Sequence, residues 1–244
     1  MAVVQLFVTC LIDTLFPDVG ESVVRLLRRA GADVLFGPEQ TCCGQPAFNA
    51  GYRPEALQMA QRTIEVLEAL PGDVVIPSGS CAAMIRHGYP ELFAEEAGWL
   101  ERSRSLAGRV WEFSHYLVDR LGFLPSVRPG GERIAYHASC HLLRGLGVDR
   151  QPRRLLEGLG GELVVLDNDC CGFGGAFSVD QPDLSGAMLD RRLNQIHESG
   201  ATTVVTADVG CLMQLEGALR RSGSAVRCRH LAQVLDERGG GPDG

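Results

Sequence analysis

The sequence of 244 residues contains 30 acidic and 23 basic residues, which gives a net charge of −7. Its length suits one large domain or two small ones, and its composition is that of a folded globular protein. Every basic residue is an arginine, which excludes chemistry that needs a lysine amine, as in phosphate-binding loops, kinases and pyridoxal phosphate enzymes. The negative charge also argues against a nucleic-acid partner.

No stretch of sequence approaches the roughly 20 apolar residues of a membrane-spanning helix. The segment Met1–Val8 lacks the charged leader of a secretory signal. We therefore expect no membrane span and a cytoplasmic location, where thiols stay reduced. The sequence has nine cysteines, an odd number that includes two vicinal pairs. This usage favours metal binding or redox chemistry over a disulfide framework.

Strand and helix patterns alternate along the first half of the chain. Short apolar runs typical of strands are followed by segments with helical spacing. The expected strands are Val3–Val8, Asp33–Phe36 and Asp73–Ile76, and the expected helices are Ser22–Ala30, Pro54–Leu70 and His115–Leu121. Such alternation indicates parallel strands joined by helical crossovers.

The same order of elements returns in the second half. The expected strands there are Arg133–His137, Glu162–Leu166 and Thr203–Thr206, and the expected helices are Arg153–Leu159, Asp183–Ser199 and His230–Glu237. The segment 123–131, rich in proline and glycine, is the predicted linker. The sequence thus predicts an α/β protein of two pseudo-symmetric, Rossmann-like βαβ halves with mainly parallel sheets, residues 1–122 and 132–238.

Eight of the nine cysteines form one pattern that occurs twice. In each half a single cysteine is followed by a Cys-Cys-Gly motif and then by a last cysteine, with spacings that agree to within two residues. We call these the first quartet (Cys10, Cys42, Cys43 and Cys81) and the second quartet (Cys140, Cys170, Cys171 and Cys211). Each cysteine follows a predicted strand, and parallel sheets bind their ligands at the carboxyl ends of strands.

Four thiolates in each half suit zinc or an iron–sulfur cluster. The Cys-x2–4-Cys knuckle of structural zinc sites does not occur, and vicinal cysteines reach separate irons more easily than a single ion. We therefore favour an iron–sulfur cluster in one or both halves, with zinc in one half as an alternative and redox chemistry of the vicinal pairs as a third interpretation. Cys228 lies outside the pattern, with Phe113 as its counterpart, and is expected to be a buried apolar residue.

Several other polar residues near the quartets have both a functional and a structural interpretation. His137 and His141 flank Cys140, where they would tune or replace a metal ligand or else cap neighbouring elements. His115 and His230 share a position in the repeat and are expected to cap helices. The other candidates, which are also ordinary surface or turn residues, are Arg144, Gln40, Gln45, Asn49, Asn168 and Asp169.

These motifs resemble the lactate utilization protein A family over nearly the whole chain. The resemblance rests on Cys10-Leu-Ile-Asp13, Cys42-Cys43-Gly44-Gln45-Pro46, Pro77-Ser-Gly-Ser-Cys81, His137-Ala-Ser-Cys140-His141 and Cys170-Cys171-Gly172-Phe173-Gly174-Gly175. The wider group is the paired cysteine-rich CCG domain, also found in iron–sulfur subunits of glycolate oxidase, anaerobic glycerol-3-phosphate dehydrogenase and heterodisulfide reductase. The resemblance implies an iron–sulfur protein that acts with two partner subunits in oxidising L-lactate to pyruvate.

One departure from this wider group concerns the end of each motif. In heterodisulfide reductase the motif ends in Cys-x-x-Cys, whereas Met84 and Gln214 stand at the final positions here. With four cysteines in each half, an ordinary [4Fe–4S] cluster is favoured over a cluster that needs five thiolates.

The predicted function is that of an iron–sulfur electron-transfer subunit in a multi-subunit L-lactate oxidation system. No Gly-x-Gly-x-x-Gly turn follows the first strand, so we expect no nucleotide cofactor and no reduction of NAD by this chain alone. Catalytic residues stay unassigned, with His141 as a weak candidate for a base. The alternatives are a metal-stabilised scaffold subunit and an iron–sulfur subunit of another 2-hydroxy-acid oxidase or heterodisulfide-reductase-like complex.

The two Cys-Cys-Gly loops differ although their cysteines match. Pro46 stiffens the first loop and lacks a backbone donor. Gly174 and Gly175 leave more N–H groups free to approach sulfur in the second loop, which would raise the potential of a cluster there. The second half is therefore expected to hold the redox-active centre.

Overall fold

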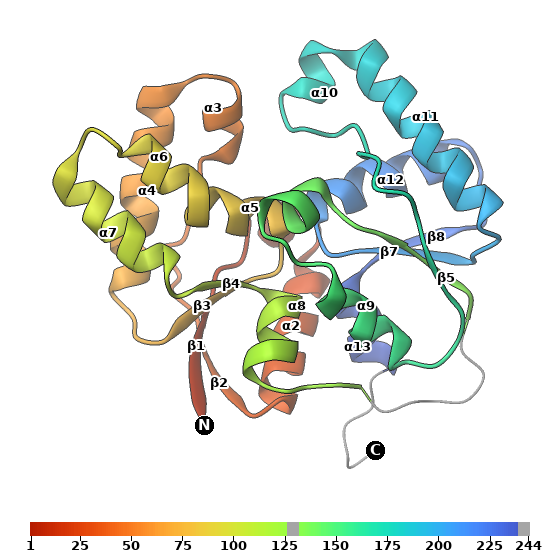
Figure 1. The fold of residues 1–244 in the computed structure, drawn as a ribbon, viewed down its shortest axis with the longest axis horizontal. Coiled ribbons are helices and arrows are strands. Elements are labelled where there is room, and N and C mark those ends of the chain that lie inside the picture. The colour runs from red at the N-terminus through yellow and green to blue at the C-terminus, as the bar shows by residue number, and fades with distance from the viewer. Residues whose placement is uncertain (126–131, 239–244) are drawn as a thin grey trace.

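Two parallel sheets, one in each half, organise the chain (Figure 1). The computed structural model describes residues 1–125 and 132–238. Within these ranges each sheet has four strands, in the orders β2-β1-β3-β4 and β6-β5-β7-β8. The strands are β1 (Ala2–Leu6), β2 (Ala32–Leu35), β3 (Asp73–Ile76), β4 (Val110–Glu112), β5 (Ile134–His137), β6 (Leu163–Val165), β7 (Thr203–Thr206) and β8 (Arg227–His230). The prediction of an α/β protein with two similar, parallel-stranded halves is confirmed.

Helices connect the strands in both halves. Those of the first half are α1 (Cys10–Leu15), α2 (Pro17–Arg29), α3 (Gln45–Asn49), α4 (Arg53–Glu68), α5 (Gly79–Ala83), α6 (Tyr89–Leu92), α7 (Ala97–Ala107) and α8 (Phe113–His115). Those of the second half are α9 (Arg150–Glu157), α10 (Phe177–Asp180), α11 (Pro182–Glu198), α12 (Val209–Arg221) and α13 (Leu231–Arg238). Short π-helical turns occur at Met84–Gly88, Tyr116–Arg120 and His141–Gly145. In the described ranges no helix is both long enough and apolar enough to cross a bilayer.

The strand register of the two sheets repeats after 130 residues. Gln5 of β1 lies opposite Val74 of β3. Ala135 of β5 lies opposite Val204 of β7, and each of these residues is 130 positions beyond its counterpart. This shared register identifies equivalent residues in the two halves, which is the basis for comparing the two cysteine quartets below.

Side chains alternate across the strands and so enter different cores. Val4, Leu6 and Val75 of the first sheet share a central core with Tyr136 and Val205 of the second. The intervening residues face outwards, into one core beneath α4 and α7 and another beneath α11 and α12. The two sheets are therefore joined by a hydrophobic core to which both halves contribute.

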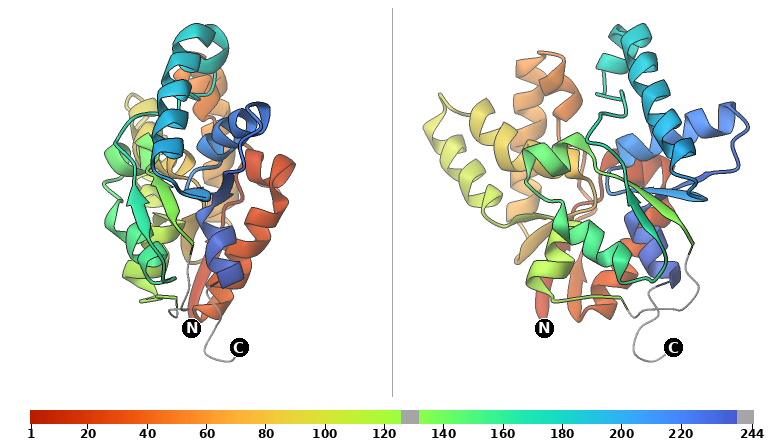
Figure 2. Two further views of the ribbon diagram at one scale, coloured as in Figure 1. Left: turned by 90° about the vertical axis from the view of Figure 1, so that its right-hand side faces the viewer. Right: turned by 45° about the vertical axis from the view of Figure 1, so that its right-hand side comes forward.

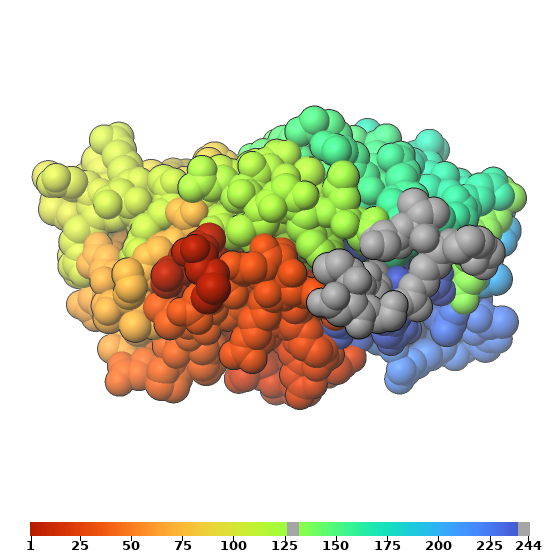
Figure 3. All heavy atoms as spheres, turned by 90° about the horizontal axis from the view of Figure 1, so that it is seen from below, coloured from red at the N-terminus to blue at the C-terminus, as the bar shows by residue number. Residues whose placement is uncertain are grey.

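Helices α2 and α13 pack together between the two sheets, and both views of Figure 2 show them side by side. An ion-pair cluster reinforces this packing, because Arg25 donates to Asp236 at 2.6 Å and Arg29 donates to the same carboxylate. Seen from the end that carries the N-terminus, side chains of the two halves adjoin each other along part of their junction (Figure 3). The halves also contact each other through α8 and α9.

The predicted strands agree with the structure to within two residues, and β3 and β7 have the predicted bounds. The fourth strand of each sheet, β4 or β8, is not predicted by the sequence. The helix expected to begin at His115 begins at Phe113, and His230 ends β8, so that α13 begins one residue later. Most of the predicted linker 123–131 lies outside the described residues, and the domain division there stays a prediction.

The register also corrects the counterpart of Cys228. Cys228 lies opposite Val204, just as Val110 lies opposite Val74, so Cys228 corresponds to Val110 and not to Phe113. Its side chain is buried in the outer core of the second half, as expected.

The shared central core predicts that the two halves unfold together. Leu27→Ala in α2 and Leu235→Ala in α13 each truncate a fully buried core residue. Each variant should lower the free energy of unfolding by about 2–5 kcal/mol. Urea unfolding followed by far-UV circular dichroism should coincide with unfolding followed by tryptophan fluorescence, which reports on the first half because both tryptophans lie there. Separate transitions for the two signals would contradict a shared core.

Candidate metal centre

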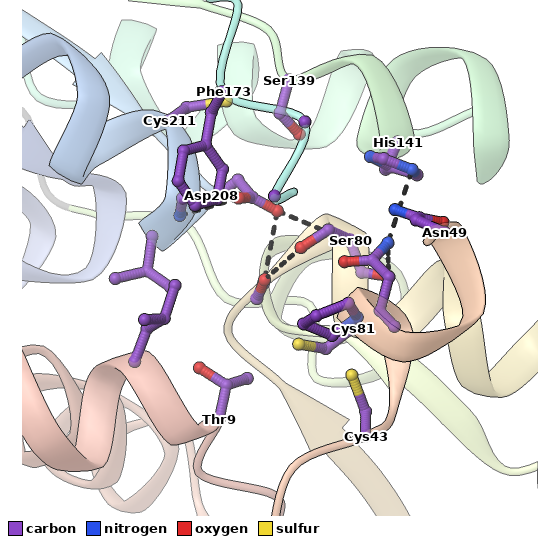
Figure 4. A pocket seen from close by; sticks show the side chains of 18 of the residues that line it. Thr9, Cys43, Asn49, Ser80, Cys81, Ser139, His141, Phe173, Asp208 and Cys211 are labelled. Atoms are coloured by element: carbon purple, nitrogen blue, oxygen red, sulfur yellow. Dashed lines mark hydrogen bonds between the residues drawn. The ribbon is translucent and has the colours of Figure 1, made fainter. Parts of the chain in front are cut away.

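Both cysteine quartets line a single cavity between the two halves (Figure 4). The cavity has a volume of about 200 Å³, and all eight cysteines contribute to its wall. In the figure Cys43 and Cys81 lie on one side, Cys211 lies on the other, and Asp208 lies between them. The sequence predicts one group of thiols in each half, but it does not predict that the two groups face each other across one cavity.

The cysteines meet because the strand order brings the relevant carboxyl ends together. From β1 the chain goes to β2 on one side and later to β3 on the other, so the ends of β1 and β3 flank a topological switch point. Cys10 begins α1 after β1, and Cys81 lies in α5 after β3. Cys140 and Cys211 follow β5 and β7 in the same way. The vicinal pairs follow the adjacent strands β2 and β6.

The glycine of each Cys-Cys-Gly motif is required by its backbone conformation. Gly44 and Gly172 have φ angles of +82° and +85°, which L side chains rarely adopt. A Cβ atom at Gly172 would also lie 2.5 Å from the carbonyl oxygen of Ser185 in α11. The equivalent atom at Gly44 would lie 3.1 Å from the Cβ of Met59 in α4. Glycine thus lets each vicinal pair turn towards the cavity while a long helix packs behind it.

The nine cysteines are all free thiols, and those of each quartet form a chain of neighbours. Hydrogen bonds from Cys10 and Cys43 lower the pKa of Cys42 well below its ordinary value. Donation to Cys42 raises the pKa of both partners, and burial adds to this effect. Cys170 has the corresponding lowered pKa in the second quartet. Each quartet therefore concentrates negative charge on the first cysteine of its vicinal pair.

Asp208 joins the two halves beside the thiols. It is 3% exposed, and it occupies the N-cap position of α12, which corresponds to Ser78 before α5. One carboxylate oxygen accepts the N–H of Gly210 at 3.0 Å, and the other accepts the N–H of Ser80 at 2.8 Å and the hydroxyl of Ser78 at 3.1 Å. A single carboxylate therefore caps two helices, one from each half, and each helix carries the last cysteine of its quartet.

Asp208 is not among the site residues predicted from the sequence. The available signal was its position three residues before Cys211, where Ser78 stands before Cys81. An N-cap residue at this place is predictable, but its second hydrogen-bonded helix belongs to the other half and leaves no mark on the sequence pattern.

His137 gives the second quartet a nitrogen donor. It is the last residue of β5 and is fully buried, and neither ring nitrogen has a hydrogen-bond partner among the described residues. A ring nitrogen of His137 and the sulfurs of Cys171 and Cys211 all lie within 4.8 Å of one another. Burial lowers the pKa of His137 to about 3, so the ring is neutral and able to donate a lone pair.

Arg192 gives the second quartet a buried positive charge. Its side chain is fully buried in α11, and its guanidinium donates to the main-chain carbonyls of Asp167 and Asp169, which precede Cys170. Burial lowers the pKa of Arg192, whereas Asp169 and the nearby thiols favour its charged form. In the first half Gln40 ties the corresponding loop to the end of β1 through two hydrogen bonds, of 2.7 and 2.9 Å.

Of the other polar residues expected near the quartets, some line the cavity and others lie outside it. Gln45, Asn49 and His141 line the cavity. The side-chain nitrogen of Gln45 lies 3.4 Å from Nε2 of His141 and donates to the carbonyl of Ser80 at 3.2 Å, so these polar groups connect the two halves. Arg144 donates to the carbonyl of Asn168, and its positive charge lies at the exposed surface.

His115 and His230 do not share a position in the repeat, contrary to expectation, and of the two only His230 caps a helix. The strand register equates His230 with Glu112. His230 does cap α13, because Nδ1 accepts the N–H of Ala232 at 3.1 Å. In the first half the cap of α8 is Glu112, which accepts the N–H of His115 at 3.1 Å, and the ring of His115 instead lies 3.4 Å from Asp119.

Burial raises the pKa of Glu112 to about 7. Because this pKa lies above the unfolded value, the protonated form stabilises the fold below about pH 4.5, and this contribution is lost as the pH rises through 7. It amounts to roughly 3 kcal/mol by linkage. The glutamine of Glu112→Gln does not titrate. The free energy of unfolding of this variant, relative to that of the wild type, should therefore be higher at pH 8 than at pH 5, as measured by urea unfolding at both pH values. Equal pH dependence of the two proteins would contradict this assignment.

The double cap predicts an unequal effect of two alanine substitutions. Asp208→Ala removes the acceptor of three hydrogen bonds and should lower the free energy of unfolding by roughly 2–4 kcal/mol. Ser78→Ala, the control at the equivalent position, removes a single donor and should cost about 1 kcal/mol. Urea unfolding of the metal-free proteins measures both, and equal losses would mean that Asp208 does not connect the halves.

Comparisons with known proteins agree with this geometry. A family model described as a cysteine-rich CCG domain matches residues 4–86 and 134–216. Lactate utilization protein A from Exiguobacterium sp. is 43% identical over 238 residues, which cover 96% of this chain and 97% of that protein. Lactate utilization protein A from Halalkalibacterium halodurans is 43% identical over the same shares, and lactate utilization protein A 2 from Bacillus cereus is 40% identical over 235 residues.

The fold also has a counterpart among solved structures. A hypothetical protein from Helicobacter pylori superposes with a TM-score of 0.69 over 98% of this chain at 12% sequence identity. This chain spans about half of that protein, 49% of its length, and the likeness concerns the fold alone. From the two cysteine-rich matches and from 40–43% identity over nearly the full length, we conclude that the chain belongs to the paired CCG cysteine-rich proteins and, among them, to the lactate utilization protein A family.

Proposed function

We propose that this chain is the iron–sulfur electron-transfer subunit of a multi-subunit system that oxidises L-lactate to pyruvate. The relatives named for lactate utilization match almost its whole length. The observation that carries the electron-transfer role is the convergence of eight thiols, four from each half, on one cavity. We expect two partner subunits, as the family resemblance implies.

The donor set fits a thiolate-bound metal group in each half. Cys10, Cys42, Cys43 and Cys81 would hold one group, and Cys140, Cys170, Cys171 and Cys211 would hold the other. An iron–sulfur cluster at these residues supplies one-electron transfer. The buried thiols of each quartet lie in apolar cores that exclude water from one side, whereas the first two cysteines of each quartet are partly exposed towards the cavity.

The cavity favours transfer of electrons over oxidation of lactate within this chain. Lactate carries a carboxylate, and its recognition normally requires a cation. Among the described residues that line the cavity none is an arginine, and Asp208 is itself an acid. Arg144 and Arg192, the arginines close to the second quartet, are bound to main-chain carbonyls. We therefore assign lactate oxidation to a partner subunit and electron transfer to this one.

Metal analysis after anaerobic purification tests this proposal. We expect iron and acid-labile sulfide in equal amounts, together with a visible absorption band that bleaches on reduction and returns on oxidation. Zinc without sulfide would contradict electron transfer and would support the alternative of a metal-stabilised scaffold that assembles a partner complex.

The unequal surroundings of the quartets predict that one of them dominates the redox signal. Cys43→Ser and Cys171→Ser alter equivalent positions in the two quartets. Arg192 and His137, however, lie near the second quartet and not near the first. A buried cation favours the reduced, more negative state of a cluster. EPR spectra of the proteins poised at partial reduction should lose most of their signal with Cys171→Ser and little with Cys43→Ser. Equal losses, with both variants folded by circular dichroism, would contradict this inequality.

A further inference from the structure

His137 occupies a position that is apolar in the first half. The 130-residue shift of the register equates His137 at the end of β5 with Phe7 at the end of β1. Phe7 is 1% exposed and packs with Cys43 and Cys81 in the outer core of the first half. The first half therefore shows what this space holds when no polar group is needed there.

In the second half the same space holds an imidazole beside the equivalent thiols. His137 is 0% exposed, and both ring nitrogens are without hydrogen-bond partners among the described residues. A buried polar group without hydrogen bonds destabilises the fold, whereas phenylalanine at this position would have no polar atom to satisfy. The imidazole therefore needs a partner that the polypeptide does not supply.

The geometry around His137 suits a metal atom as that partner. The sulfurs of Cys171 and Cys211 lie 3.2 Å apart, and both lie within 4.8 Å of a ring nitrogen of His137. A tetrahedral metal lies about 2.3 Å from a sulfur ligand and about 2.0–2.1 Å from a nitrogen ligand. At these distances the ligand atoms themselves lie roughly 3.5–3.8 Å from one another. The three atoms can therefore reach one metal with small side-chain movements. Among the described residues this is the single set of three such donors that close together.

Arg192 is a second difference between the two halves near this site. Its position in α11 corresponds to Thr63 in α4. A Cβ atom added at Gly44 would meet the carbonyl oxygen of Ala56, and one added at Gly172 would meet that of Ser185, and these residues lie seven positions before Thr63 and Arg192. The guanidinium of Arg192 lies close enough to His137 to act on the ring, after burial, as a cause of the lowered pKa of His137. The second half thus has a cation and an imidazole where the first has a threonine and a phenylalanine.

We propose that His137 is a nitrogen ligand of the metal group bound by the second quartet. The first half then holds a centre with thiolate ligands alone, and the second holds a mixed thiolate–imidazole centre. On a single ion such as zinc, Cys171, Cys211 and His137 would share the metal, whereas in a cluster whose irons each take one protein ligand His137 would hold an iron in place of one of the cysteines. This inference rests on the proposed function only in requiring that the second quartet binds metal.

Two probes test the ligand without measuring activity. The first is the protein reconstituted anaerobically with iron and sulfide and examined by pulsed EPR in its reduced state. The second is the metal-free protein loaded with Co²⁺, whose visible spectrum responds to a change from sulfur to nitrogen ligation. The variants are His137→Phe, which introduces the residue found in the first half, and His141→Ala, which removes the cavity-lining histidine and serves as the control.

We expect nitrogen coupling in the wild type and in His141→Ala and its loss in His137→Phe, with a Co²⁺ spectrum that shifts only in His137→Phe. Identical spectra of wild type and His137→Phe with both probes would overturn the proposal. If His137→Phe does not fold, wild-type protein grown with ¹⁵N-histidine replaces it: the coupling must change with the isotope, and an unchanged spectrum refutes imidazole ligation. Absence of iron and sulfide from every sample would contradict the electron-transfer function, whereas the Co²⁺ spectra would still decide whether His137 is a ligand.

Discussion

The carboxylate of Asp208 is the interaction on which the shared cavity depends. It accepts hydrogen bonds from the start of α12 in its own half and from the start of α5 in the other. Because Cys211 and Cys81 lie in these two helices, their positions relative to each other are fixed through one buried group. A buried charge is tolerated only when its hydrogen bonds are satisfied, and here three donors from two halves are needed to satisfy it. The halves cannot separate at this point without breaking the two hydrogen bonds that Ser78 and Ser80 donate to Asp208.

Much of the layout within each half was predictable from the sequence. The apolar runs before Cys10 and Cys140 predicted β1 and β5, and the repeated spacing of the cysteines predicted a duplicated fold. These features are local, because a strand pattern of period two and a helix pattern of period 3.6 can be recognised along the chain. The expected burial of Cys228 followed from its place outside the repeat.

Other features escaped the sequence analysis for physical reasons. Strand β8, Arg227–His230, is an edge strand of mostly polar residues, so its composition gave no apolar signal. Because this strand was not predicted, the counterparts expected for Cys228 and His230 in the first half lie three residues beyond the correct ones. The single cavity arises from contacts between halves, such as Arg25 with Asp236, and no periodicity along the chain encodes how two domains face each other. The hydrogen bonds of Asp208 belong to the same class of long-range contact.

Duplication has kept the backbone and changed the chemistry at equivalent positions. Phe7 and Thr63 of the first half correspond to His137 and Arg192 of the second, as described above. The cysteines were retained in both halves, and so each half keeps a site rich in thiols, but among the described residues only the second quartet has a buried imidazole and a buried guanidinium next to it. Two centres of different potential in one cavity would give electrons a direction of travel, which a symmetric pair would not.

The central claim is that the two quartets hold redox centres that face each other across one cavity. The EPR spectrum of the fully reduced protein, compared with that of the half-reduced protein, tests it most directly. If the centres share the cavity, full reduction places two paramagnetic groups close together, and the spectrum should show broadening and splitting from their magnetic interaction that is absent at half reduction. A fully reduced spectrum that is the simple sum of two isolated signals would contradict the shared cavity.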